Sequence, residues 1–132
     1  MNCSTPTRTT EHPSFLAAAV VKGTAVILGP RHHAKVLVPT DLFYYVRSTL
    51  GAGTVKVDYR LSATGELSTD AADRTRWTDW IALLANNTTE LFERVAMPTI
   101  TAPFYQLRVT GLGGNPTDTI VDLWIVSKEG VL

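Results

Sequence analysis

The strongest constraint on the fold is a strict alternation of apolar and polar residues over positions 54–62, TVKVDYRLS. Val55, Val57, Tyr59 and Leu61 share one phase, and the residues between them are polar or charged. Successive side chains of a β-strand point to opposite faces, so this pattern predicts a strand with one buried and one solvated face. Glycines at 51, 53 and 65 flank the run and favour chain reversal at both ends.

The same period of two returns near the C-terminus. Tyr105, Leu107 and Val109 alternate with polar residues over 105–110, and a segment rich in Gly, Asn and Pro precedes a further run at 119–127. We interpret these two runs as a β-hairpin. Apolar residues occupy both phases of 120–126, which predicts a central strand or one covered by a neighbouring subunit.

Shorter β-type runs between turn residues lie at 15–21, 24–28, 34–38, 42–49, 77–83 and 91–97. With the three runs above, they give about nine short strands, and at most one turn of helix is expected. Many short antiparallel strands separated by Gly and Pro predict an all-β fold, either a two-sheet antiparallel β-sandwich or a small barrel. The residues that we place in its core are Val57, Tyr59, Leu107, Val109 and Trp124.

The first thirteen residues differ from the rest of the chain. They contain two prolines and four threonines, and only Met1 and Cys3 are apolar. Such a segment cannot be held by burial of its own side chains. We therefore predict a flexible N-terminal arm at 1–13 and a single β-sandwich domain at 14–132.

Charge and composition disfavour two classes of partner. Twelve Lys and Arg residues balance twelve Asp and Glu residues, so the chain offers no net attraction to nucleic acid or to an anionic membrane surface. The apolar stretch at 15–21 is far shorter than the ~18 residues that span a bilayer, and it is poorly placed for a signal peptide. We expect a globular protein with no nucleic-acid or membrane partner.

Residues that could carry chemistry are few. His32 and His33 are neighbours, and on a strand they would point to opposite faces, where they cannot bind one metal ion. Asp70, Asp73 and Asp79 lack the spacing of a calcium loop. Cys3 lies in the arm, and no nucleophile elbow is present. We predict no catalytic residue, metal or cofactor, and hence a protein that is not an enzyme.

Two tryptophans in the segment WTDW are the best candidates for a ligand-binding surface. Exposed tryptophans stack on the apolar faces of sugars. If 77–83 is a strand, Trp77 and Trp80 face opposite sides, so at least one of them belongs to the core. Core or interface packing is the leading interpretation, and a carbohydrate-binding module that uses Trp77 or Trp80 is the alternative.

Four segments in order carry a resemblance to a known family: TVKVDYRLS followed by Gly, then WTDW, then APFYQLRVTG, then a final apolar strand. This pattern, over about residues 53–127, resembles the head decoration or cement proteins of tailed bacteriophages. The resemblance implies a jelly-roll-like sandwich on the capsid exterior. It implies a non-enzymatic virion protein, made in the host cytoplasm, that binds the major capsid protein and stabilises contacts between its subunits.

Two groups of residues are candidates for protein contacts. Arg8 and Glu11 lie in the predicted arm and could pair with charges on a neighbour. Val121, Leu123 and Ile125 form one apolar phase of the last strand, and we predict that they mediate self-association, most simply as a dimer.

Overall fold

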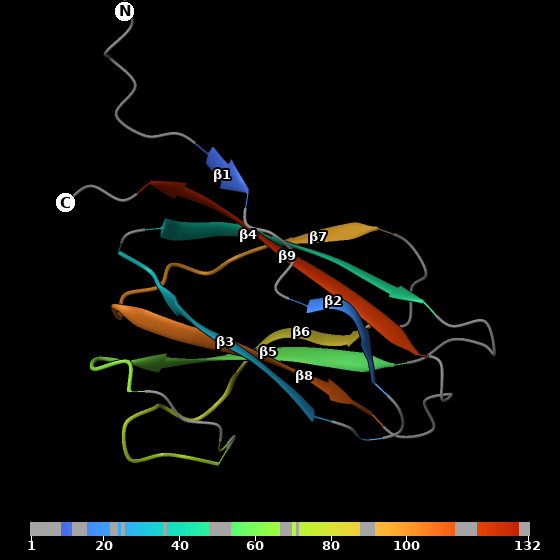
Figure 1. Cartoon of the computed structure of the whole chain (residues 1–132), viewed down its shortest axis with the longest axis horizontal. Helices are drawn as coiled ribbons and strands as arrows, with labels where there is room; N and C mark the ends of the chain where they lie inside the picture. Colours follow the sequence, from blue (N-terminus) through green and yellow to red (C-terminus); the bar gives the residue numbers. More distant parts are fainter. Residues whose placement is uncertain are drawn as a thin grey trace, which may run out of the picture.

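The computed structural model describes residues 9–11, 16–21, 24, 26–35, 37–47, 54–66, 70, 72–87, 92–112 and 119–129. These residues form two antiparallel β-sheets and no helix (Figure 1). The prediction of an all-β antiparallel sandwich is confirmed. No helix of the described residues is long and apolar enough to cross a membrane.

Sheet A contains both ends of the described chain. Its central strands β9 and β4 are antiparallel, β7 pairs with the free edge of β4, and β1 and β2 both pair with the other edge of β9. The strands are β1 (Thr9–Glu11), β2 (Leu16–Val20), β4 (Leu37–Arg47), β7 (Glu93–Ala96) and β9 (Ile120–Glu129). Residues 9–11 of the predicted arm are therefore part of the sheet.

Sheet B has the order β3-β8-β5-β6. Its strands are β3 (Val26–His33), β5 (Val55–Ser62), β6 (Ile81–Asn87) and β8 (Phe104–Gly111). The two best alternating runs of the sequence, β5 and β8, are neighbours at its centre, with Val57 opposite Val109 and Tyr59 opposite Leu107.

The core lies between the inner faces of the two sheets. Val57, Leu107 and Val109 are fully buried there as predicted, and Tyr59 packs against them while partly buried. Full burial of such an aliphatic side chain stabilises the fold by about 1.5–3 kcal/mol. The inner face of sheet A supplies Leu42, Tyr44, Val46, Val121, Leu123 and Ile125.

The predicted phase of the last strand was wrong. Trp124 pairs with Phe43 and lies outside the core, whereas Leu123 pairs with Tyr44 and is fully buried. Both phases of β9 are apolar, so its own pattern cannot select the inner one. The register against β4 selects it, because Leu42 and Tyr44 face inward.

The predicted hairpin of 105–110 with 119–127 was also wrong. β8 pairs with β3 and β5, whereas β9 pairs with strands of sheet A. The segment between them therefore carries the chain from one sheet to the other. A turn-rich sequence favours reversal in either case, and only the packing of the sheets decides whether the flanking strands pair with each other.

Candidate functional site

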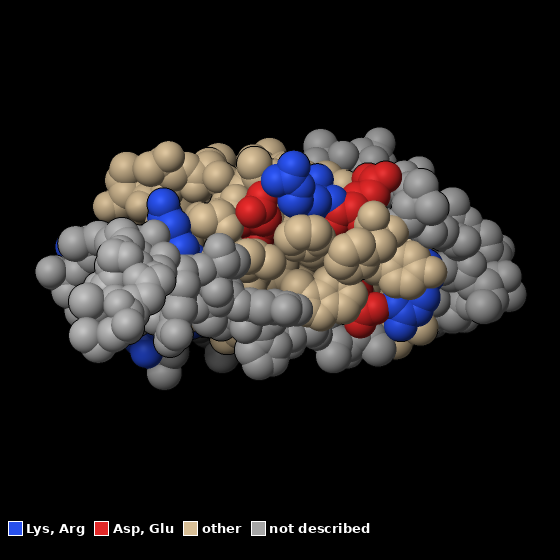
Figure 2. Space-filling model, turned by 90° about the horizontal axis from the view of Figure 1, so that it is seen from above, with Lys and Arg blue, Asp and Glu red and all other residues tan. Residues whose placement is uncertain are grey.

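The outer face of sheet A carries an aromatic cluster. Phe92, just before β7, lies 5.5 Å from the Phe43 ring and 5.3 Å from the Trp124 ring between centroids. Together with Val126, these side chains line a hollow of about 420 Å³. Phe92 is 60% exposed. We call these four residues the aromatic face; Figure 2 looks onto sheet A from this side, with uncharged side chains between groups of charged ones.

Ion pairs flank the aromatic face along β4. Arg94 of β7, which lies opposite Phe43, donates a hydrogen bond at 2.7 Å to Asp41, which lies opposite Val126 at one end of the cluster. Arg47 pairs with Asp122 beyond the other end, and its guanidinium lies 5.2 Å from the centroid of the Tyr45 ring. An apolar centre inside a polar rim is typical of protein–protein contact surfaces.

The outer face of sheet B is covered instead by the chain between β5 and β6. Asp58, Arg60, Ser62 and Gln106 all point away from the core, yet each is buried. The described parts of 63–80 lie over them, in the yellow-green loop below sheet B in Figure 1. The end of this loop is fastened to β5, because Thr78 donates its N–H to the Leu61 carbonyl and its Oγ1 accepts from the Leu61 N–H.

Arg60 is the centre of this covered face. Its Nε and Nη2 both donate to Gln106 Oε1, at 2.9 and 2.7 Å, and its Nη1 donates to the carbonyls of Asp70 and Asp73. The guanidinium also contacts two aromatic rings, at 4.9 Å from the Trp77 centroid and 4.6 Å from the Trp80 centroid. One fully buried cation therefore joins β5 and β8 to the loop.

Burial and nearby charges act on Arg60 in opposite directions. Loss of solvation lowers the pKa of its guanidinium, while the carboxylates of Asp73 and Asp70 oppose that shift. A second arginine on the same face, Arg108, donates to Asp58 at 3.1 Å. The paired charges and carbonyl acceptors make burial of these cations possible.

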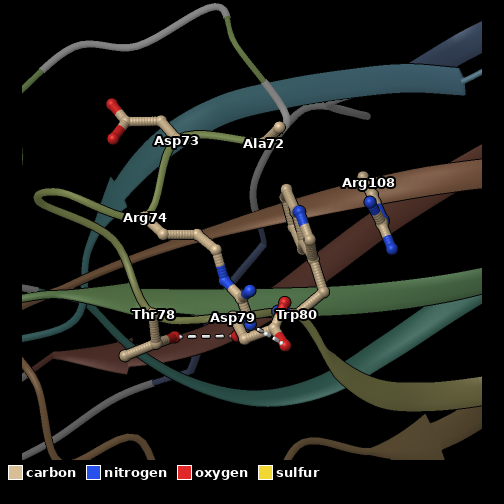
Figure 3. Close-up of a pocket in the computed structure, with 7 residues that line it drawn as sticks. All are labelled: Ala72, Asp73, Arg74, Thr78, Asp79, Trp80 and Arg108. Carbon is tan, nitrogen blue, oxygen red and sulfur yellow. Dashed lines mark hydrogen bonds and ion pairs between the residues drawn. The ribbon is translucent and has the colours of Figure 1, made fainter.

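A pocket of about 330 Å³ opens beside this network, lined by Ala72, Asp73, Arg74, Thr78, Asp79, Trp80 and Arg108 (Figure 3). Arg74 forms an ion pair with Asp79 across it. The Arg108 guanidinium lies 4.5 Å from the Trp80 centroid. Trp80 thus contributes to the pocket wall while two guanidinium groups contact its ring.

The two tryptophans do not lie as the alternation of a strand would place them. Residues 77–80 precede β6, and both rings contact the same guanidinium. Trp77 is 3% exposed and donates its Nε1–H to the Glu66 carbonyl, so it is unavailable for stacking on a ligand. At least one of the two was predicted to belong to the core; Trp77 is indeed buried, but it packs outside sheet B and not in the core between the sheets.

The residues predicted for protein contacts have different positions. Val121, Leu123 and Ile125 are fully buried between the sheets, so they do not form an accessible second apolar face. Their neighbours Trp124 and Val126 form it instead, together with Phe43 and Phe92. Glu11 ends β1 opposite Val126, and Arg8 lies outside the described residues.

The histidines lie on opposite sides of β3, as the alternation predicts. His32 stacks on Tyr105, and His33 contacts the edge of Phe104. Within the described part of the chain, no group of three or more His, Cys, Asp or Glu side chains is arranged to hold a metal ion. Comparison with known protein families and with curated protein sequences finds no match to this chain.

Proposed function

We propose that this chain is a structural protein of a bacteriophage virion, a decoration protein that binds the outside of the assembled head and stabilises contacts between major capsid protein subunits. The observation that carries the proposal is the strand pairing. β2 pairs with β9, β3 with β8, β4 with β7 and β5 with β6. Each pair is nested inside the previous one, and successive pairs alternate between sheet A and sheet B.

Nested pairing of this kind is what a long hairpin makes when it rolls up into two sheets, with β1 and β2 as two parts of one edge strand. It supports a jelly roll, an architecture that viral capsid proteins and lectins use. A fold alone does not decide between such functions. The order of segments within 53–127 that resembles decoration proteins favours the virion role.

The N-terminal segment is the proposed capsid-gripping element. β1 pairs with residues 126–128 at the edge of sheet A. We propose that this arm, with Arg8 and Glu11, contacts a neighbouring capsid subunit. A protein that binds only the assembled shell stabilises it by mass action at many equivalent sites.

Co-sedimentation with capsids tests the proposal. The full chain should pellet with assembled heads of the phage that encodes it and should not bind the unassembled major capsid protein. A chain that lacks 1–8 should keep a melting temperature near that of the full chain, because β1 and all described core residues are retained, whereas a chain that lacks 1–11 also loses the pairing of β1 with β9. Both chains should dissociate from heads at lower temperature or denaturant. Failure of the full chain to pellet with heads refutes the capsid role, and equal retention of the truncated chains refutes the role of the arm.

The alternative is a carbohydrate-binding module. It is favoured by the pocket in which Trp80 lies beside Asp73 and Asp79, because such sites combine an aromatic ring with polar groups that fix orientation. Saccharides should then quench tryptophan fluorescence in the wild type and in Trp124→Phe but not in Trp80→Phe. Quenching that survives Trp80→Phe, or no quenching at all, excludes this site.

A further inference from the structure

The outer faces of the two sheets differ in how far their side chains are covered. On sheet B, the loop over Arg60 buries the outward side chains of β5 and β8. On sheet A, Phe43 and Trp124 are only partly buried, and Phe92, which packs over both, is itself 60% exposed. Among the described residues, the aromatic face is thus an apolar cluster whose outermost ring meets solvent.

The aromatic face has a projection and a hollow side by side, so a second copy of the same surface can be complementary to it. It combines a projecting ring, Phe92, with a hollow of about 420 Å³ beside it. That volume is within the ~300–1,000 Å³ of pockets that enclose small organic groups. In a dimer of this chain, Phe92 of each copy can therefore enter the hollow of the other copy.

The charges around the aromatic face favour the same partner. Asp41, Phe43, Tyr45 and Arg47 follow one another along the outer side of β4, with Arg94 on β7 and Asp122 on β9 beside it. Each of these two ion pairs joins one arginine to one aspartate and carries no net charge. A partner with charges of one sign would meet a like charge at each ion pair, whereas a surface that carries both signs can complement itself.

We infer that the aromatic face binds a second copy of this chain in a two-fold, face-to-face dimer. When the axis lies in the interface and runs across the strands, the Arg47 end of β4 in one protomer lies over the Asp41 end of β4 in its partner. Arg47 of each protomer then lies over Asp41 of the partner subunit, because both residues are on the outer side of β4. Two-fold contacts of this type use the same surface on both copies and close without further growth.

The inference goes beyond the proposed capsid role, because dimerisation is measured on the protein alone. Sedimentation velocity and equilibrium of the full chain in the micromolar range should show a reversible dimer. Phe92→Ala and Trp124→Ala should each raise the dimer dissociation constant by about 30-fold or more, as aromatic residues central to an interface do. Ile81→Ala, which removes an exposed apolar side chain from sheet B, is the matched control and should leave dimerisation unchanged.

A mixing experiment tests the self-complementary rim. Arg47→Gln with Arg94→Gln leaves an acidic rim, and Asp41→Asn with Asp122→Asn leaves a basic one. Each double variant should dimerise more weakly than wild type at low salt, and an equimolar mixture should form heterodimers of nearly wild-type strength, since opposite rims then meet. Circular dichroism before mixing confirms that both variants are folded.

Three outcomes overturn the inference. The first is a wild-type chain that stays monomeric throughout the concentration range. The second is dimerisation that survives both Phe92→Ala and Trp124→Ala, and the third is a mixture that associates no better than its components. Head binding is scored separately: a monomeric Phe92→Ala protein that still pellets with heads leaves the capsid role intact, whereas a wild-type dimer that never pellets refutes the capsid role alone.

Discussion

Replacement of Arg60 tests whether the buried cation holds the loop onto sheet B. Arg60→Met keeps an unbranched side chain of similar length and removes the charge with all its donors. Gln106 is almost fully buried, and its Oε1 loses both of its bonds to Arg60. An unsatisfied buried acceptor costs about 1–3 kcal/mol. The carbonyls of Asp70 and Asp73 can rebind water, because Asp70 is exposed and Asp73 partly so.

Two further effects of Arg60→Met on the free energy of unfolding have opposite signs and nearly cancel: the loss of cation–π contacts and the removal of a buried charge. The contacts of the guanidinium with Trp77 and Trp80 are each worth about 0.5–2 kcal/mol. Removal of a buried charge recovers part of its desolvation cost. We therefore expect a net loss of about 1–3 kcal/mol in the free energy of unfolding. With about 2.1 cal/mol/K of unfolding entropy per residue, a loss of about 2 kcal/mol lowers Tm by about 7 °C for a chain of this length.

Urea denaturation followed by circular dichroism measures the loss, and tryptophan fluorescence reports the loop directly because both rings contact Arg60. Arg74→Met is the matched control. Arg74 is exposed and its pair with Asp79 lies at the surface, so its replacement should cost under about 0.5 kcal/mol. Gln106→Leu combined with Arg60→Met should cost less than the sum of the single changes. A loss below about 0.5 kcal/mol for Arg60→Met refutes the anchoring role.

Two other changes probe the turn after β5 and the core. Gly65 has a φ of +65°, and a Cβ there would lie 2.6 Å from the Phe104 ring, so Gly65→Ala should cost about 2–5 kcal/mol in urea denaturation; a loss within about 0.5 kcal/mol would contradict this packing. Burial raises the pKa of the Tyr105 hydroxyl, so folded Tyr105 stays neutral where unfolded tyrosine ionises. The contribution of Tyr105 to the free energy of unfolding is intact below about pH 10 and is lost as pH rises further. Stability should therefore fall less steeply above pH 10 in Tyr105→Phe, and equal slopes in urea titrations would contradict the assignment.

The sequence predicts a strand well where only one of its phases is apolar. In β5 and β8 the inward positions of Val57, Leu107 and Val109 follow from alternation alone. In β9 both phases are apolar, and the pattern gives no preference between Leu123 and Trp124. That choice depends on the register with β4, a contact between distant parts of the chain that local periodicity does not encode.

The covered face of sheet B was missed for a related reason. Arg60 occupies the polar phase of β5, and a charged residue in that phase normally faces water. The available signal was the long segment 63–80 with its two tryptophans. A loop of that length usually has a structural or functional role, and its aromatic side chains are expected to pack against the rest of the protein. Interpreting 77–80 as strand assigned the two rings to opposite faces and hid their common contact with one guanidinium.

The contrast between the two outer faces follows from how each sheet hides its outward side chains. Sheet B uses its own loop, and the buried polar groups of Arg60 and Gln106 fix that loop in one position, because few other arrangements would satisfy all their hydrogen bonds. Sheet A carries Phe43 and Trp124 in the same outward phase, and their ring contacts with Phe92 need no directional hydrogen bonds. An apolar face without fixed bonding partners can be exposed in the monomer and buried on contact. That property makes the aromatic face, rather than the Arg60 network, the surface suited to reversible association.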